Sequence, residues 1–257
     1  MRTIDINCDM GEGFGAYTLG NDDAMLSIVT SANIACGFHA GDPLVMHRTL
    51  ALAAQRGVNV GAHPGFFDLW GFGRRRILDD SPADIAKQVI YQIGALQALA
   101  KSQGVRLAHV KTHGSLGNMS AEDPALAAAV AGAIAAVDKG LSFIVMPAMA
   151  TEVAALDAGL APIREIYADR AYADSGNLVS RKLPGAVIHD PDLAAERVLR
   201  MIEADMVICE SGKKIAARID SICVHGDTPD AVTMAKRLRQ KLEAAGYSVA
   251  PPIKESR

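Results

Sequence analysis

The stretch TIDINCD, residues 3–9, alternates apolar and polar side chains along a run with the composition of a β-strand. Because side chains point to opposite faces of a strand in turn, Ile4 and Ile6 share one face, and Asn7 and Asp9 share the other. A parallel strand buried between two helix layers is apolar on both faces. One polar face instead favours a closed barrel, in which apolar side chains pack outward against helices and polar side chains line the interior.

Two later stretches repeat this alternation. In VNVGAH, residues 58–63, His63 falls on the face opposite Val60, and in AHVKTH, residues 108–113, Lys111 and His113 fall opposite Val110. Ordinary eight-stranded barrels fill their interior with branched apolar residues. The polar interior predicted here departs from that rule and indicates a deep polar pocket at the mouth of the barrel.

Helices alternate with strands along the chain. Five dipeptides combine a capping side chain with a proline, which suits the first helical position, and each precedes a long apolar-rich run. These predicted helix starts are Asp42-Pro43, Ser81-Pro82, Asp123-Pro124, Asp190-Pro191 and Thr228-Pro229. With about seven strand-like runs between them, the order indicates parallel βαβ units, either closed into a barrel or opened into a doubly wound sheet. The alternation of faces favours the barrel.

Composition excludes several classes of protein. The 257 residues carry a net charge of −3, with basic residues dispersed apart from Arg74, Arg75 and Arg76, so we expect no nucleic-acid partner. No linker, secretory signal or run long enough to span a membrane is present, and the four cysteines lack zinc-ligand spacing. We therefore expect a cytoplasmic protein with a single domain over residues 1–257 and a small hairpin insertion near 205–218. Self-association stays open.

Chemically active side chains gather where the predicted strands end. Four of the seven histidines, His39, His63, His113 and His225, lie close to glycines, which permit tight turns and close approach of the backbone to a ligand. Since the carboxyl ends of barrel strands meet at one rim, we expect these histidines to share a site. The other predicted site residues at these ends are Asn7, Asp9, Glu12, Lys111, Asp169 and Arg170, and Arg74, after a Gly/aromatic turn, is predicted to bind an anion.

Two further patterns bear on cofactors. Asp9, His39 and His63 offer one carboxylate and two imidazoles, a set that binds Zn²⁺ or another divalent ion and activates water. The glycine-rich GEGFG, residues 11–15, lacks both the GxGxxG spacing and a GK[ST] ending. We interpret it as a loop that covers the substrate rather than as a phosphate-binding loop.

Seven motifs, in order along nearly the whole chain, resemble the LamB/YcsF family. They are NCDMGEGFG, SANIACGFHAGDP, GAHPGFFDLWGFGRR, HVKTHGSL, YADR, PGAVI and ICVHGD. Members of that family are identified as the A subunit of an ATP-dependent 5-oxoprolinase. The resemblance implies a distorted (β/α)7 TIM-like barrel of the glycoside hydrolase/deacetylase type.

The same resemblance implies the reaction: cleavage of the lactam of 5-oxo-L-proline to L-glutamate, coupled to ATP hydrolysis and carried out with two partner subunits of the B and C types. The family's typical KPHGALYN reads KTHGSLGN here, with Thr112, Ser115 and Gly117 at the changed positions. Loss of the tyrosine side chain at Gly117 is expected to widen the pocket. ATP binds either through unfamiliar loops of this chain or mainly on the partner subunits, where phosphorylation of the amide oxygen would take place.

This chemistry suggests roles for the predicted residues. A base for water is assigned to Asp9, helped by His39 or His63, and Lys111 with Arg74 would stabilise developing negative charge.

A proton shuttle is assigned to His113 or His225, because imidazole titrates near the working pH. Asp169 and Arg170 would orient these groups or hold the substrate carboxylate and amine. The predicted substrate-binding set is Asn7, Glu12, Arg74, Asp169 and Arg170.

Two rival functions stay open at the level of the sequence. A metal-dependent deacetylase or other amide hydrolase on the same barrel would need a stoichiometric divalent metal and no ATP. A non-catalytic protein that binds a small carboxylate or a sugar would need no partner subunits, but it does not account for so many titratable groups around one pocket.

Overall fold

A computed structural model describes residues 2–226 and 230–252 of the chain. Seven parallel strands form its central sheet, in the order β1-β2-β3-β4-β5-β6-β9, and the sheet closes because β1 also pairs with β9. The strands are β1 (Thr3–Met10), β2 (Ser31–Ala35), β3 (Asn59–His63), β4 (His109–Lys111), β5 (Ser142–Val145), β6 (Ala161–Tyr167) and β9 (Ser221–Cys223). The predicted (β/α)7 barrel is confirmed.

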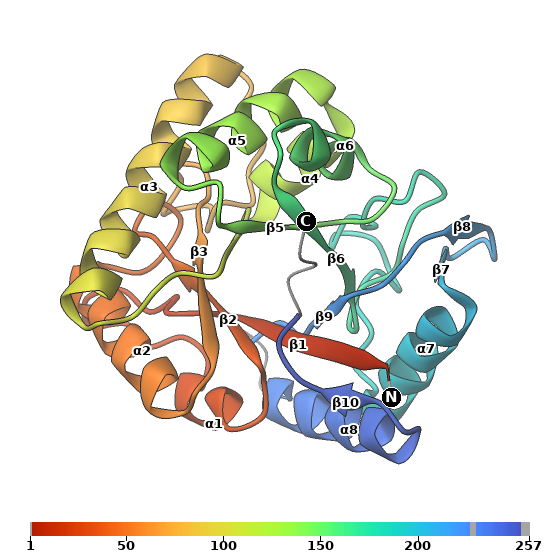
Figure 1. The fold of residues 1–257 in the computed structure, drawn as a ribbon. Coiled ribbons are helices and arrows are strands. Elements are labelled where there is room, and N and C mark those ends of the chain that lie inside the picture. The colour runs from red at the N-terminus through yellow and green to blue at the C-terminus, as the bar shows by residue number, and fades with distance from the viewer. Residues whose placement is uncertain (1, 227–229, 253–257) are drawn as a thin grey trace.

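Helices surround this barrel on the outside (Figure 1). They are α1 (Asp22–Leu26), α2 (Pro43–Gln55), α3 (Pro82–Ser102), α4 (Gly114–Glu122), α5 (Pro124–Val137), α6 (Ala150–Asp157), α7 (Pro191–Ala204) and α8 (Ala231–Ala244). A short antiparallel pair, β7 (Met206–Ile208) and β8 (Lys214–Ala216), follows α7, and β10 (Ser248–Val249) adds to the free edge of β1 at its start. No single helix in the described ranges is long and apolar enough to cross a membrane; α4 and α5 reach that length only together, across a 119° bend.

Capping side chains start four of these helices as predicted. Asp42, Ser81, Asp123 and Asp190 each accept a hydrogen bond from a backbone N–H of the first turn, with proline at the first helical position. These bonds satisfy donors that the helix itself leaves unpaired. The fifth predicted start, Thr228-Pro229, lies outside the described residues.

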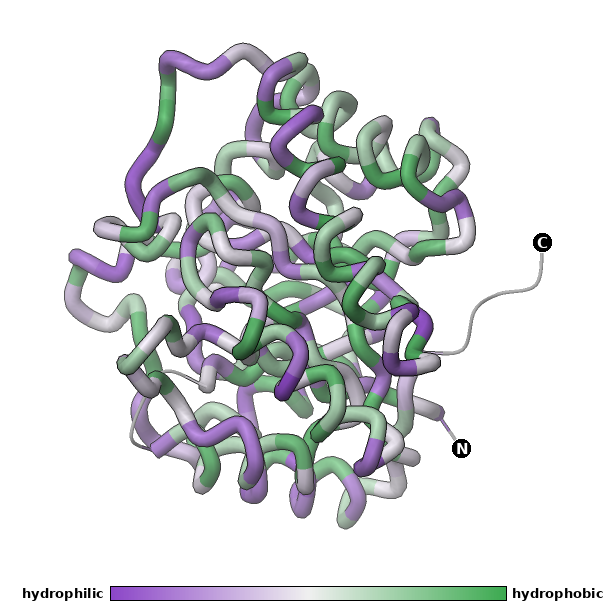
Figure 2. Tube along the Cα trace, turned by 90° about the vertical axis from the view of Figure 1, so that its left-hand side faces the viewer, coloured by the Kyte–Doolittle hydropathy of each residue, from purple (hydrophilic) through white to green (hydrophobic). Residues whose placement is uncertain are grey.

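The alternation along β1 places its side chains as the sequence predicted. Ile4 and Ile6 are fully buried in the apolar layer between strands and helices. Asn7 and Asp9 pair in register with Ser31 and Asn33 of β2, so polar side chains face one another inside the barrel. In Figure 2 hydrophobic segments concentrate in the interior and hydrophilic ones on the outward turns of the helices.

Close packing inside the barrel requires a glycine on β3. Gly61 pairs with His109 of β4, and a Cβ atom at Gly61 would lie only 2.2 Å from Cδ2 of the His109 ring. The ring instead crosses the strand and its Nε2 lies 2.8 Å from Oδ1 of Asn33. Because Gly61 has no side chain, the His109 ring has room to reach Asn33 inside the barrel.

Asp5 lies at the base of the barrel with no exposed surface and accepts hydrogen bonds from the hydroxyls of Thr30, Ser31 and Ser221. Burial raises the pKa of its carboxyl to about 6, against the lowering effect of these hydrogen bonds.

Because the folded-state pKa of Asp5 exceeds its unfolded value, this group favours the folded protein at low pH, and that contribution is lost as the pH rises from about 4 to about 6. The shift corresponds to about 3 kcal/mol. We expect the free energy of unfolding of wild type, relative to Asp5→Asn, to fall by about that amount between pH 4 and pH 7, in urea unfolding at each pH. Parallel profiles for the two proteins would contradict this account of Asp5.

Candidate active site

A cavity of about 930 Å³ opens at the carboxyl ends of the barrel strands. Eight of the eleven predicted site residues line it: Asp9, Glu12, His63, Arg74, Lys111, His113, Arg170 and His225. The other three, Asn7, His39 and Asp169, contact the lining from behind through hydrogen bonds. The predicted strand ends therefore do meet at one site.

Lys111 is the centre of this site. Its side chain is only 3% exposed, and its Nζ lies 3.0 Å from Oδ1 of Asp9, Oε1 of Glu165 and Sγ of Cys223. Burial disfavours the ammonium form, but Asp9 and Glu165 outweigh it and hold the pKa of Lys111 well above its usual value. The ring of Tyr167 adds a cation–π contact at 5.1 Å. The site thus keeps a fixed positive charge at the floor of the cavity.

Asn7 orients the groups around Lys111. It is fully buried, donates to Glu165 Oε1 and Ser221 Oγ at 2.7 Å, and accepts from Lys111 Nζ at 3.3 Å. Its Oδ1 also accepts a hydrogen bond from Asn33 at 2.8 Å. Each hydrogen-bonding group of its side chain is therefore engaged within the barrel, which makes Asn7 a positioning residue below the cavity lining.

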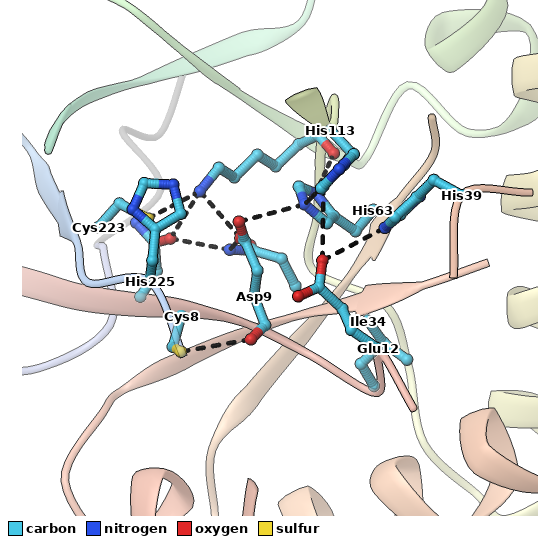
Figure 3. A network of polar contacts seen from close by, with 12 residues as sticks. Cys8, Asp9, Glu12, Ile34, His39, His63, His113, Cys223 and His225 are labelled. Carbon is cyan, nitrogen blue, oxygen red and sulfur yellow. Dashed lines mark hydrogen bonds and ion pairs between the residues drawn. The ribbon is translucent and has the colours of Figure 1, made fainter. Parts of the chain in front are cut away.

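Asp9 joins Lys111 to a group of histidines. Its Oδ1 contacts Lys111, while its Oδ2 lies 3.3 Å from Nε2 of His63. Burial opposes its ionisation, but His63 and Lys111 hold the pKa of Asp9 well below its usual range. Asp9 is therefore an anion at neutral pH and a weak proton acceptor. Figure 3 shows Asp9 between Cys223 and His225 on one side and His63 and His113 on the other.

Four side chains form the histidine side. Nδ1 of His113 lies 3.0 Å from Nε2 of His63 and 3.5 Å from Oε1 of Glu12, and Nε2 of His39 lies 3.3 Å from the same Glu12 oxygen. His39 stacks on His113 with ring centroids 3.6 Å apart. Burial, together with the neighbouring histidines, lowers the pKa of both His39 and His113 well below the usual value, so both rings are neutral at pH 7.

The WGFG turn, residues 70–73, closes over these histidines. Nε2 of His113 donates to the carbonyl oxygen of Phe72 at 2.8 Å, and Phe72 has a φ of 54°, which a non-glycine residue rarely adopts. A Cβ atom at Gly73 would lie 2.7 Å from Cβ of His39 and 2.8 Å from Cδ2 of His113. The glycine therefore lets the turn lie directly on both rings.

His225 and Asp169 form a separate pair on the other side of Lys111. Nδ1 of His225 lies 2.8 Å from both carboxylate oxygens of Asp169, and the His225 ring stacks on Tyr167. Burial opposes the ionisation of Asp169, but His225 lowers its pKa overall. Because Asp169 accepts the hydrogen bond from Nδ1–H, Nε2 is the ring nitrogen of His225 that is left to exchange a proton in the cavity.

Two predicted substrate-binding arginines differ in their surroundings. Arg170 donates through Nη2 to the carbonyl oxygen of Val179 at 2.6 Å and through Nε to that of Ala186 at 3.3 Å, so it anchors the segment 179–186 that forms one wall. Arg74 lies at the rim, over the Phe72 ring at 4.9 Å.

Three residues around Lys111 were not predicted as site residues: Glu165, Tyr167 and Cys223. Glu165 and Tyr167 share one face of the β6 run IREIY, so the alternation used for β1 would have identified them. Cys223 carries no such signal, because a thiol in an apolar run is more often a small packed residue.

The closed parallel barrel and the charged cavity at its strand ends define an α/β-barrel enzyme of the deacetylase-type fold. The chain belongs to the LamB/YcsF family, whose profile matches residues 4–257, and the resemblance inferred from its motifs is confirmed.

Relatives and solved structures agree with this membership. A Rhodopseudomonas palustris protein, named as the A subunit of 5-oxoprolinase, is 55% identical over 248 residues, 96% of this chain and 98% of the relative. A Gluconobacter oxydans protein of the same name is 53% identical over 96% of this chain and 97% of its own. The crystal structure of a lactam utilization protein from Thermus thermophilus superposes with a TM-score of 0.89, at 44% identity, over 96% of this chain and 99% of that one.

A more distant structure shares the fold alone. The catalytic domain of a peptidoglycan N-acetylglucosamine deacetylase from Eubacterium rectale has a TM-score of 0.51 at 13% identity, over 100% of this chain and 94% of that one. This likeness agrees with the deacetylase-type barrel that was expected from the sequence.

Replacing Lys111 by methionine would leave two buried carboxylates, Asp9 and Glu165, without their counter-ion. We expect Lys111→Met to lower the free energy of unfolding by about 3–5 kcal/mol at pH 8, the usual cost of removing one partner of a buried ion pair. The loss should be smaller at pH 5, where the two carboxylates take up protons more readily. Urea unfolding at both pH values measures this, with the exposed Lys139→Met as the matched control, which we expect to change stability by no more than about 0.5 kcal/mol. A loss no larger than that of the control would contradict the buried ion-pair account.

Proposed function

We propose that this chain is the A subunit of a 5-oxoprolinase, which opens the lactam ring of 5-oxo-L-proline to give L-glutamate. The names of the relatives, which are at least half identical to this chain over nearly its whole length, support this function. The observation that carries it in the site is the fixed ammonium of Lys111, held by Asp9 and Glu165 at the floor of the cavity. Hydrolysis of an amide develops negative charge on the carbonyl oxygen, and a preorganised cation in a buried site stabilises that charge strongly.

Proton transfer is best assigned to His225. Asp169 holds its Nδ1–H, so Nε2 accepts a proton from the attacking water and returns it to the ring nitrogen when the lactam opens. Asp9 was assigned as the base from the sequence, but a carboxylate with a strongly lowered pKa accepts protons poorly. Its role in this proposal is to hold Lys111 and His63.

The charge of the cavity suits an anionic substrate. Among the described residues, seven cationic and four anionic side chains line it, although the chain as a whole carries a net charge of −3. Arg74, Arg181 and Lys182 lie on its outer walls, where they would attract the carboxylate of 5-oxoproline and a phosphate group.

Coupling to ATP and the requirement for two partner subunits are further parts of this proposal. ATP would phosphorylate the amide oxygen, so that attack of water and departure of the ring nitrogen give an acyl phosphate, from which a second water releases inorganic phosphate to leave L-glutamate. The sequence has no GK[ST] phosphate loop, so we assign ATP binding mainly to the partner subunits of the B and C types. A cytoplasmic location and a single domain over residues 1–257 stay predictions; the hairpin β7–β8 at 206–216 supports the expected insertion near 205–218.

One rival has a specific observation in its favour. The neutral histidines beside Glu12 offer ligands for a divalent metal, which a metal-dependent amide hydrolase would require. That rival predicts turnover by this chain alone, without ATP. A non-catalytic binding protein would show no turnover under any condition.

Glutamate release from 5-oxoproline tests these functions. We expect release only when this chain, both partner subunits and ATP are present together. Release by this chain alone without ATP would support the amide hydrolase instead, and no release under any condition would contradict the 5-oxoprolinase proposal.

In the same assay we expect His225→Ala to lower kcat by about 10²–10⁴-fold, the usual contribution of a general acid or base. The exposed His189→Ala should keep full activity and serves as the matched control. Full activity of a folded His225→Ala protein would remove the proton-transfer assignment while leaving the overall reaction intact.

A further inference from the structure

His63 and His113 each have one ring nitrogen fixed as a donor. Nδ1 of His63 lies 2.7 Å from the carbonyl oxygen of Lys111, and Nε2 of His113 lies 2.8 Å from that of Phe72. Because a carbonyl oxygen only accepts hydrogen bonds, both of these nitrogens carry a proton. The other two nitrogens, Nε2 of His63 and Nδ1 of His113, lie 3.0 Å apart, and Oδ2 of Asp9 lies 3.3 Å from the same His63 nitrogen.

Two ring nitrogens at this separation repel each other through their lone pairs unless a cation, a proton or a metal ion, lies beside both. Oε1 of Glu12, 3.5 Å from Nδ1 of His113, adds a negative charge at the same point. Glu12, His63 and His113 are all buried and all line the cavity. The space between their ligand atoms is therefore shielded by the protein on one side and open to the cavity on the other.

We propose that Glu12, His63 and His113 bind one divalent transition-metal ion such as Zn²⁺ at the edge of the cavity floor. Two histidines and one glutamate, with an open position for water or substrate, form a known catalytic zinc set. Ligand atoms about 2.0–2.1 Å from a tetrahedral ion lie roughly 3.3 Å from one another. Nδ1 of His113 lies 3.0 Å from Nε2 of His63 and 3.5 Å from Oε1 of Glu12, which is close to this spacing.

The surroundings of the two histidines match those of metal ligands. A histidine that binds a metal nearly always donates its second N–H to a carbonyl or carboxylate, which fixes the tautomer and the ring orientation. Here two backbone carbonyls, of Lys111 and Phe72, accept these bonds. The strained backbone at Phe72 and the glycine at 73 are what bring the second carbonyl into place.

His39 supports this site from behind. Its Nε2–H donates to Glu12, its Nδ1 is buried without a hydrogen-bond partner, and it does not line the cavity. Its ring is nearly parallel to that of His113, with an angle of 4° between the planes. Because lone pairs lie in the ring planes, these two stacked rings cannot both point at one ion, and we assign the ligand role to His113.

A cation already lies beside a second group of possible metal ligands, which are Asp9, Cys223 and His225. The Lys111 ammonium lies 3.0 Å from both Asp9 and Cys223 and neutralises the carboxylate. The predicted metal candidates Asp9, His39 and His63 thus share only His63 with the proposed set.

The proposal does not rest on the 5-oxoprolinase reaction, because metal binding is measured without turnover.

The test uses the full chain, stripped with a chelator and titrated with Zn²⁺ by calorimetry. Co²⁺ replaces Zn²⁺ in a parallel sample to give a visible absorption spectrum. We expect one ion per chain in wild type, and at least about 100-fold weaker binding in Glu12→Gln and in His113→Ala, since loss of an outer-shell partner alone costs 10–100-fold. The exposed His47→Ala is the matched control and should bind as wild type does.

Circular dichroism of each variant shows whether it is folded, and Glu12→Gln, which keeps the side-chain size, decides alone if His113→Ala does not fold. Wild type that binds neither ion stoichiometrically would overturn the proposal. Binding that survives Glu12→Gln but is lost in Cys223→Ser would assign the ion to the second group and would also overturn it.

Discussion

The buried ammonium of Lys111 is the constraint on which the site depends, and it requires the closed barrel. A cation with 3% exposure is stable only with counter-charges in direct contact. Asp9 comes from β1, Glu165 from β6 and Cys223 from β9, and these are the strands that meet where the barrel closes. The charge centre therefore exists only in the closed barrel. An open sheet would leave the ammonium and its partners apart.

Asp9 divides the cavity floor into two parts with different chemistry. One carboxylate oxygen holds Lys111, and the other faces His63 and the neutral histidine group. On the far side, His225 has a fixed tautomer and a nitrogen available for proton transfer. A fixed positive charge, the proposed proton carrier and the proposed metal ligands thus lie around one cavity.

Much of this arrangement follows from local sequence rules. Side-chain alternation predicted the barrel and placed Asp9, Lys111 and His113 inside it, because strand geometry fixes the faces regardless of what packs around them. The capping dipeptides predicted helix starts, because a capping side chain bonds only to the first turn of its own helix. Tertiary contacts did not follow from the sequence: Asn7 shared a face with Asp9 but lies below the lining, and Arg170 holds two backbone carbonyls of a distant segment. Only the fold shows which of two inward side chains reaches the cavity.

The charge state of Lys111 most directly tests whether a fixed positive charge is the centre of the site. The ¹³Cε and ¹⁵Nζ chemical shifts of this lysine, assigned by comparison with Lys111→Arg, report its protonation as the pH is raised. Since Asp9 and Glu165 raise its pKa well above the usual value despite burial, we predict a charged ammonium throughout the range, about pH 10.4, in which an unperturbed lysine loses its proton. Titration of Lys111 below that range would show that burial outweighs the two carboxylates, and would contradict a fixed positive charge as the centre of the site.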